Sequence, residues 1–445
     1  MLNILSRMTS CNLLNVKLSV GVKQIFVYIL LSLSCSTLAD DMTPLDYVDP
    51  NIGSVHSRWF FYTPGSQPFG MAKPSPVTNG SEGNRYGWEA VGYDGTHTSI
   101  EGFANFHEFQ IGGVVLMPTT GKLKTQPGKL DMSDNGYRSR FLKKDEIAKP
   151  GYYSVLLKDY NIQAELTATP RVSFHRYTFP SAKQSNILFD IGNQQGESGV
   201  VIDTYINKVS PTEIEGYVVT HPEYVKKYQP GAMVKMYFVA NLSKPAKTFG
   251  TFRGQQIFKK QSVIQGPGAG LYLSYETESG EAIDIKVGQS YISIDNARMN
   301  LAREASELSF EQTRDQSAKR WNEMLGRIEI GGGKESDRVK FYTGLYHALL
   351  GRGMASDING QYPKNNGGIG QIPINDDGLP EYNHYNTDAS WGTFWNLTQL
   401  WALVYPDYYS EFVRTQLDIF KDSGWLADGV ATGKFVSGVG TNFTG

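Results

Sequence analysis

The sequence contains little cysteine and no excess of charge of either sign. Its 445 residues include two cysteines, Cys11 and Cys35, so the chain after residue 40 cannot form a disulfide. Lys and Arg total 42 against 44 Asp and Glu, which gives a net charge of -2. A strong electrostatic hold on nucleic acid or on anionic lipid is therefore unexpected, and we predict no nucleic-acid partner.

Several motifs that carry well-known chemistry are also absent. The chain has no P-loop, no dinucleotide-binding fingerprint, no nucleophile elbow and no His-Glu-x-x-His helix. Its seven histidines are scattered without metal-ligand spacing, so no metal site is predicted among them. His107 and Glu108 could form a ligand pair, but a hydrogen-bonded structural histidine is the better interpretation. The sequence therefore does not favour a function in phosphate transfer or in nicotinamide-dependent chemistry.

The first 39 residues have the pattern of an export signal. Two lysines precede the apolar run 25–33, which has roughly signal-peptide length and is short for a membrane span. Residues 37–39 then offer a small-residue cleavage site. Lipid attachment through Cys35 is the weaker alternative, because Ser32 stands where a leucine-like residue is expected. We predict a periplasmic or secreted protein without stable membrane insertion after cleavage.

Residues 40–290 show the pattern of an antiparallel β-sandwich. Short runs alternate between apolar and polar residues and are separated by Gly, Pro and Asn, as in all-β domains. The predicted strands are Tyr153–Leu157, Ile162–Ala168, Arg171–Phe179, Asn186–Ile191, Met233–Ala240, Tyr272–Tyr275 and Ile283–Val287.

The period then changes to that of helices. Ser309 with Gln312 predicts a capping box at the start of one helix. Four apolar stripes follow at helical spacing: Ala318, Trp321, Leu325 and Ile328; Val339, Tyr342, Tyr346 and Leu349; Phe394, Leu397, Trp401 and Val404; Tyr409, Phe412, Leu417 and Phe420. We predict a helical linker over 291–320 and part of a helical domain over 321–445.

Two segments concentrate Trp, Tyr, Asp, His and Asn, at residues 86–108 and 381–391. Aromatic rings beside carboxylates and amides are typical of sugar recognition, because rings stack on sugars while polar groups bind hydroxyls. The second segment ends the long loop Asp357–Ser390, and loops of that length are usually functional. The alternative is a pair of packed loops at a domain interface.

These segments also carry a resemblance. Residues 47–53, Tyr-Val-Asp-Pro-Asn-Ile-Gly, are followed in order by several short motifs: Thr63–Gly65, Pro68–Met71, Pro74–Pro76, Gly92–Tyr93, Ile100–Phe103, His107, Leu116–Gly121, Trp321–Leu325 and Phe341–Tyr346. In this order they resemble glycoside hydrolase family 92 over essentially the whole exported chain.

The resemblance implies an N-terminal β-sandwich packed against an (α/α)6 barrel, with the site at their junction. It implies a calcium-dependent exo-α-mannosidase that removes terminal mannose from N-glycans or mannan and inverts the anomeric centre. The partner would be a mannose-containing oligosaccharide or glycoprotein glycan. In the family the acid Glu, the base Asp and most Ca2+ ligands come from later barrel segments. The resemblance thus implies an incomplete barrel without catalytic or metal-binding residues in this chain.

Five residues are candidate substrate contacts: Trp88, Tyr93, His107, Asp388 and Trp391. We predict that Trp88, Asp388 and Trp391 converge where the two domains meet. The chain also departs from the family pattern. Gly392 stands where the family has a sugar-binding Asp, and 104–106 read Ala-Asn-Phe where the family has Ser-His-Thr. These departures indicate a divergent branch, with another linkage or sugar as an option.

Two other classes of function remain open at this point. Another (α/α)6 carbohydrate enzyme, such as a glucoamylase-like hydrolase or a phosphorylase, would also combine a β-sandwich with helices. It would not explain the ordered N-terminal motifs. A non-catalytic carbohydrate-binding protein is the second alternative, and it fits a chain without the catalytic carboxylates.

Overall fold

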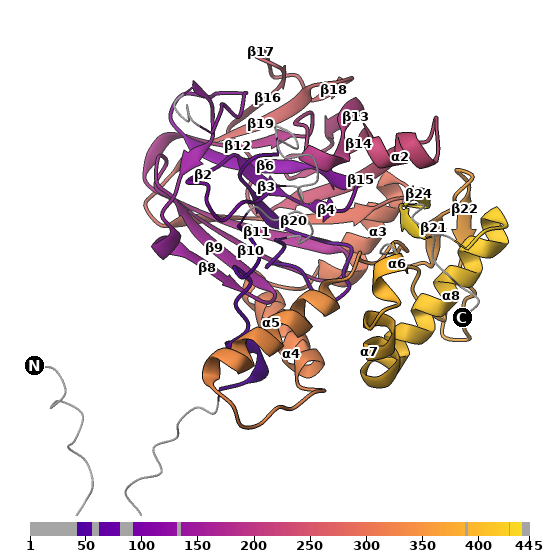
Figure 1. Ribbon diagram of the computed structural model, residues 1–445. Coiled ribbons are helices and arrows are strands. Elements are labelled where there is room, and N and C mark those ends of the chain that lie inside the picture. The colour runs from indigo at the N-terminus through magenta and orange to yellow at the C-terminus, as the bar shows by residue number, and fades with distance from the viewer. Residues whose placement is uncertain are drawn as a thin grey trace, which may run out of the picture. The chain divides into compact units, whose positions relative to one another are not determined.

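Two large antiparallel sheets form the first part of the molecule (Figure 1). The computed structural model describes residues 42–55, 62–80, 92–130, 135–387, 390–426 and 428–437. One sheet has the order β1 (Ser75–Val77), β3 (Gly102–Ala104), β6 (Val115–Thr120), β12 (Ala182–Asp190), β19 (Ala269–Thr277), β16 (Thr248–Arg253) and β17 (Gln256–Lys259). The other has the order β18 (Val263–Gln265), β13 (Val200–Lys208), β14 (Glu213–His221), β15 (Val234–Leu242), β20 (Glu281–Ser290), β11 (Val172–Phe179), β10 (Ile162–Ala168), β9 (Tyr152–Leu157) and β8 (Glu146–Lys149).

The inner faces of the two sheets share one apolar core. Phe189 of β12 stacks on Phe238 of β15 across the layers, with ring centroids 6.4 Å apart. Phe103 and Tyr177 make a similar contact at 5.9 Å. Side chains from Ile162 to Leu166 of β10 alternate between buried and partly exposed positions, which is the pattern of a strand with one face on a core. The prediction of an N-terminal antiparallel sandwich is confirmed.

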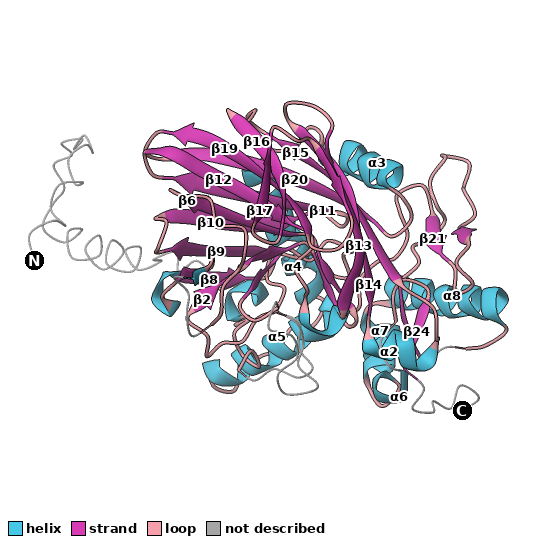
Figure 2. Ribbon diagram, turned by 90° about the horizontal axis from the view of Figure 1, so that it is seen from above, coloured by secondary structure: helices cyan, strands magenta, loops and turns pink. Residues whose placement is uncertain are grey.

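Helices lie around the two sheets (Figure 2), and the last of them come after the sandwich in the sequence. In the described residues they are η1 (Pro44–Tyr47), η3 (Lys143–Asp145), η4 (Gly196–Ser198), α2 (Glu223–Tyr228), α3 (Ile294–Ala305), α4 (Phe310–Leu325), α5 (Glu335–Leu350), α6 (Ser390–Thr393), α7 (Leu397–Val404) and α8 (Pro406–Ser423). Helix α3 lies on the nine-stranded sheet, where Leu301 packs with Val172 and Phe174. None of the helices in the described ranges is long and apolar enough to cross a membrane.

The predicted helices are present, with shifts at some ends. Ser309 and Gln312 form the expected capping box at the start of α4. That helix ends at Gly326, before the glycines at 331–333 that we expected to stop it. Helix α8 ends at Gly424 in the left-handed conformation, as the glycine predicts.

One detail of the helical part was predicted wrongly. Helix α8 buries Tyr408, Phe412 and Ile419, whereas Leu417 and Phe420 of the predicted stripe are both half exposed. Hydrophobic periodicity identifies a helix but does not decide which apolar positions find partners. The long loop also has structure of its own, since it contains the hairpin of β21 (Gln361–Pro363) and β22 (Ile369–Gln371).

Candidate active site

The long loop after α5 is fixed to the sandwich by a buried carboxylate. Asp357 is 1% exposed and accepts hydrogen bonds from Ser290 Oγ at 2.7 Å, Asn296 Nδ2 at 2.8 Å and Asn300 Nδ2 at 2.7 Å. Burial raises the pKa of Asp357, and these donors oppose that rise. The start of the loop is therefore anchored to the end of β20 and to α3.

A buried arginine makes a second attachment. Arg171, in the turn between β10 and β11, pairs with Glu304 of α3 at 2.8 Å. Its Nε donates to the Ser356 carbonyl at 2.8 Å, and its other terminal nitrogen donates to Asn383 Oδ1 at 2.9 Å. One guanidinium thus holds both ends of the loop against the sandwich, using the fixed fork geometry of arginine.

Asn386 connects the sandwich to the last hairpin, β23 (Gly429–Ala431) and β24 (Lys434–Ser437). Its Nδ2 donates to Glu108 Oε2 at 3.0 Å, and its Oδ1 accepts from the Thr432 backbone N–H at 2.7 Å. Glu108 lies on the short strand β4 (Phe106–Glu108). A Cβ added at Gly353 would lie 2.2 Å from Glu108 Oε1. The backbone φ of +77° at Gly353 also favours glycine.

Trp391 of α6 is the most accessible of the predicted sugar-binding residues in the described chain. Its side chain is 36% exposed, and its backbone N–H donates to Asp428 Oδ1 at 3.1 Å. The Asp428 carbonyl accepts from the Ser390 N–H at 2.6 Å, and Thr387 pairs with Val430 through two backbone hydrogen bonds. These contacts hold an aromatic ring at the surface, where it can stack on a sugar face.

His107 has a structural environment. It is 1% exposed, and its Nδ1 lies 2.6 Å from Ser75 Oγ. Gly92, with a φ of +102°, packs against the ring so closely that a Cβ there would lie 2.9 Å from His107 Cε1. His107 therefore fixes the path of the chain leading into Tyr93 rather than facing solvent.

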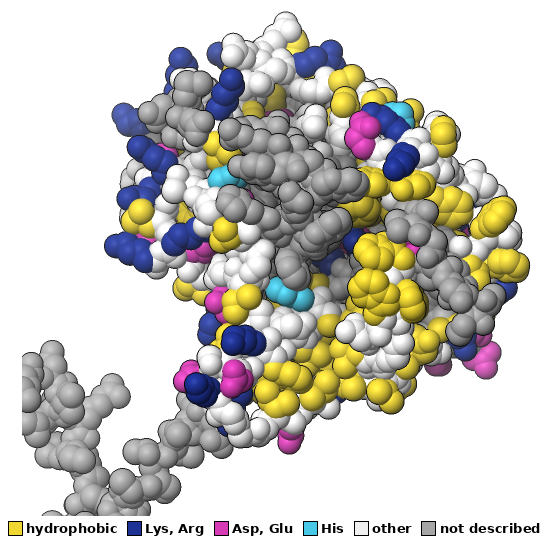
Figure 3. All heavy atoms as spheres, in the orientation of Figure 1, with side chains coloured by type: hydrophobic (Ala, Val, Ile, Leu, Met, Phe, Trp, Pro, Cys, Tyr) yellow, Lys and Arg dark blue, Asp and Glu magenta, His cyan; other side chains and the backbone are white. Residues whose placement is uncertain are grey.

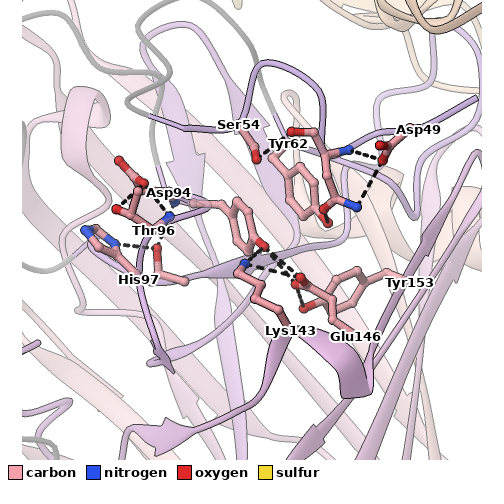
Figure 4. A network of polar contacts seen from close by, with 12 residues as sticks. Asp49, Ser54, Tyr62, Asp94, Thr96, His97, Lys143, Glu146 and Tyr153 are labelled. Carbon is pink, nitrogen blue, oxygen red and sulfur yellow. Dashed lines mark hydrogen bonds and ion pairs between the residues drawn. The ribbon is translucent and has the colours of Figure 1, made fainter. Parts of the chain in front are cut away.

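Tyr93 belongs to a polar cluster with Tyr62, Lys143, Glu146 and Tyr153, and Figure 4 labels these four partners. It is 3% exposed, stacks on Tyr62 with centroids 3.9 Å apart, and donates to both oxygens of Glu146 at 2.9 Å. Tyr153 donates to the same carboxylate at 2.6 Å, and Lys143 contacts it from the other side. Burial first, and the Glu146 charge second, raise the pKa of Tyr93. This cluster supports the segment that leads to the candidate site.

Of the five predicted contacts, Trp88 and Asp388 lie outside the described residues. The predicted convergence of Trp88, Asp388 and Trp391 therefore stays a prediction. The described neighbours of these positions are well anchored: Gly92 packs on His107, and Thr387 and Ser390 bond to the segment 428–430. The burial of Tyr93 and His107 does not favour direct contact with a substrate. It suits a role in holding the neighbouring chain in place.

Asp428 and Asn386 were not predicted as parts of the site. Asp428 accepts the Trp391 N–H and lies only 37 residues further along the chain. Asn386 falls within the aromatic-rich segment but carried no distinguishing pattern. The one available signal for Asp428 was its place directly before Gly429, the first residue of the short strand β23.

The carboxylates near these loops differ in what they could do. Glu101 is fully buried and paired with Arg138 at 2.8 Å, which makes it structural. Glu381 is exposed and lies 3.4 Å from Arg414. Glu108 and Asp428 are 2% and 8% exposed and serve as acceptors for Asn386 and Trp391. They can orient neighbouring groups.

Calcium, which the resemblance implies, needs six to eight oxygen ligands, several of them carboxylates. In the parts of the chain that the structure describes, no three Asp, Glu, His or Cys side chains converge to hold a metal ion. These residues alone do not fit a calcium site.

Comparison with known families agrees with the fold. Residues 47–290 match the glycosyl hydrolase family 92 N-terminal domain, and residues 296–443 match the glycosyl hydrolase family 92 catalytic domain. These two matches together cover most of the chain and identify a family of glycosyl hydrolases. The chain belongs to family 92.

Similar proteins are described as a glycosidase or as mannosidases. A protein of Arthroderma benhamiae described as an uncharacterized secreted glycosidase is 27% identical over 350 residues, which are 72% of this chain and 42% of that protein. A family GH92 α-mannosidase of Bacteroides thetaiotaomicron, solved with mannoimidazole, superposes with a TM-score of 0.79 at 24% identity, over 89% of this chain and 51% of that one.

A family GH92 inverting mannosidase of the same bacterium gives a TM-score of 0.73 at 22% identity, over 90% of this chain and 51% of that one. The chain thus spans about half the length of these two solved structures and less than half of the curated relative. At these identities the two structures establish the fold.

Proposed function

We propose that this chain forms the sugar-binding half of an exported α-mannosidase site that acts on terminal α-linked mannose of N-glycans or mannan. The observation that carries this is the exposed Trp391 ring, held by Asp428 beside the anchored loop. Family membership supports glycoside chemistry, and the α-mannosidase names of two similar structures support the sugar. The secreted relative and the N-terminal signal pattern support export.

The proposed chemistry is inversion at the anomeric carbon. An acid protonates the leaving oxygen and a base activates water on the opposite face, with the two carboxyl groups roughly 6.5–9.5 Å apart. Glu101 and Glu381 are committed to Arg138 and Arg414, and Asp428 holds Trp391. We therefore assign the acid, the base and the calcium ligands to residues outside the described ones. This chain alone should bind mannosides without turning them over.

Trp391→Ala tests the binding role. Loss of the ring should weaken binding of methyl α-mannoside about tenfold, which corresponds to about 1.4 kcal/mol. Trp425→Ala is the matched control, because Trp425 is 72% exposed and lies beyond the end of α8. Titration calorimetry on both variants is the measurement. Equal losses, or no loss with Trp391→Ala, would reject Trp391 as the sugar platform.

Turnover is tested separately, with calcium and aryl α-mannosides. No hydrolysis above the uncatalysed rate is expected, because acid–base catalysis alone contributes roughly 10²–10⁴-fold. Robust turnover by the 445-residue chain would contradict the expectation of binding without turnover and direct attention to Glu108 and Asp388. Gly392→Asp adds the carboxylate that the resemblance expects. A Cβ there meets nothing within 4 Å, so the variant should fold and bind mannoside more tightly.

A second candidate is a non-catalytic carbohydrate-binding protein. It is favoured by the hydrogen bonds and ion pairs of the described carboxylates of the site, because these contacts engage the carboxylates in holding the structure. Mannoside binding without hydrolysis, in the chain alone and after addition of the remaining part of a family 92 barrel, would favour this candidate over the enzyme.

A further inference from the structure

A separate cavity of about 570 Å³ lies where the start of β15 meets the hairpins β21–β22 and β23–β24. Its walls come from residues within 229–237, 291–292, 363–369 and 432–434. In Figure 1 these segments lie around α2, β21, β22 and β24. The volume falls in the range of small-molecule sites. Neither Trp391 nor Asp428 is among the lining residues.

The cavity carries positive charge. Lys235, Lys364 and Lys434 line it, and no Asp or Glu occurs among its described lining residues. Lys364 is neutralised by Asp422 at 3.0 Å. For the other two lysines, the described part of the chain provides no ion pair within 4.0 Å. Two ammonium groups therefore share the cavity without a carboxylate in its wall.

Lys434 is held in place by backbone acceptors. Its Nζ donates to the Lys364 and Asn365 carbonyls, both at 3.1 Å. Burial, and next the charge of Lys235, lower the pKa of Lys434. Its charge is thus partly desolvated and repelled by a neighbour. An anion in the cavity would relieve both effects, because opposite charge favours the ionised form of a lysine.

The walls are tied together by side-chain amides. Gln229 Nε2 donates to the Asn365 carbonyl at 2.9 Å, while Gln229 Oε1 accepts from Asn365 Nδ2 at 3.0 Å and from the Phe435 N–H at 3.1 Å. Asn365 Nδ2 also donates to the Gly433 carbonyl at 2.9 Å. Three distant segments are therefore fixed to one another, which holds the lysines in a defined geometry.

We propose that this cavity binds a sugar carrying a phosphate or sulfate ester, with the ester beside Lys434 and Lys235. Ammonium groups are point charges that suit a tetrahedral oxyanion, whereas the guanidinium fork suits planar carboxylates. The ring of Tyr237 in the wall provides apolar surface and a hydroxyl group for the sugar. The site is independent of mannoside hydrolysis and survives failure of that proposal.

Titration calorimetry on the full chain tests the proposal with four probes: glucose 6-phosphate, glucose 6-sulfate, glucose and inorganic phosphate. At least one ester should bind ten times more tightly than both glucose and inorganic phosphate. The two esters identify which oxyanion the cavity prefers. Binding of glucose or of inorganic phosphate as tight as that of the better ester would overturn the proposal, because either the anion or the sugar would then contribute nothing.

Lys434→Met keeps the length of the side chain and removes its charge, so affinity for the better ester should fall at least tenfold. Lys235→Met, at a more exposed position, should also lower the affinity for the better ester. It is the deciding variant if Lys434→Met unfolds at a lower temperature than the wild type. Lys259→Met is the matched control, since Lys259 lines another lysine-rich cleft. Equal loss with Lys259→Met, or unchanged affinity in both cavity variants, would refute the site.

Discussion

The sandwich and the last helices differ in how they treat their apolar residues. Inward-facing strand residues such as Phe189, Phe238 and Ile285 are fully buried between the sheets. The region after residue 390 exposes large apolar side chains: Trp391, Phe394, Trp395, Leu403, Val413, Leu417, Phe420, Trp425 and Leu426. Figure 3 shows hydrophobic side chains gathered on the face over α7 and α8.

The difference shows that the sandwich provides its own partners, whereas the described residues around α7 and α8 cover only one side of those helices. Contiguous exposed apolar surface of this kind usually marks an interaction site or an aggregation liability. Substitutions in the first region should therefore cost folding free energy. Substitutions on the exposed face of the second should change association instead.

The buried ion pair of the sandwich should give the largest effect. Arg138 and Glu101 are both fully buried and 2.8 Å apart, so Glu101→Gln leaves a charge without its partner. We expect a loss of about 3–5 kcal/mol in the free energy of unfolding. Glu381→Gln, which breaks the exposed pair with Arg414, should cost less than about 1 kcal/mol. Urea denaturation of both variants measures the contrast, and equal losses would remove it.

A matched pair of apolar residues extends the test. Trp321 of α4 is fully buried against the sandwich, and its Nε1 donates to the Ser66 carbonyl at 2.9 Å. Trp321→Ala should cost about 3–5 kcal/mol, because it leaves a large cavity and an unsatisfied carbonyl. Leu403 is 83% exposed, so Leu403→Ala should stay within about 0.5 kcal/mol. A similar shift in both urea midpoints would contradict the comparison.

Acid should weaken the sandwich through His175. Burial lowers the pKa of His175 to about 3, while the unfolded value is about 6.5. The unfolded chain therefore binds the extra proton between these values, so stability present above pH 6.5 is lost as the pH falls toward 3. His175 should contribute a slope of about 1.4 kcal/mol per pH unit.

Unfolding of the wild type and His175→Gln between pH 4.5 and 7 measures this slope. Asp190, whose pKa burial raises to about 7, contributes the opposite slope, which the difference between the two proteins removes. His347 of α5, with its pKa lowered to about 4 by burial, should behave like His175 over a narrower range. Parallel pH profiles for wild type and His175→Gln would show that the histidine does not couple to folding.

The smallest effect on stability should accompany a clear effect on association. Leu403→Lys with Leu417→Lys places two charges on the exposed helical face and should change unfolding by no more than about 0.5 kcal/mol each. Light scattering should show less self-association than in the wild type. Val263→Lys, at a 43% exposed position of β18, is the control and should leave association unchanged. If only the control variant reduced self-association, the surface responsible for association would lie on the sandwich.

The sequence predicted the sandwich well where alternation was strong. Strand β10 was predicted with its observed bounds, because residues on one face meet the core and those on the other do not. Strands β13 and β14 were not predicted. Their partly exposed faces carry Tyr205, Tyr217 and Glu215, which weakens the apolar signal. The capping box of α4 was predicted because it is local, involving two residues of one turn.

The candidate site was predicted only in part. The aromatic-rich loop before α6 was recognised from its composition, and Trp391 is indeed accessible. Asp428, Gly353 and Asn386 could not be recognised, since their roles depend on contacts with Trp391 and Glu108 that exist only after folding. A sequence pattern reveals residues that recur at regular spacing, whereas each of these residues has its role alone.

The anchoring of Asp357 has a consequence for the order in which parts of the molecule open. Because this carboxylate is held by residues of β20 and α3, the loop belongs to the cooperative unit of the sandwich. Amide hydrogens of residues 355–357 donate to carbonyls within that anchored loop. Their exchange with deuterium should therefore be as slow as that of the neighbouring sheet, while amides of α7 exchange earlier, although α7 is a regular helix and the loop is not.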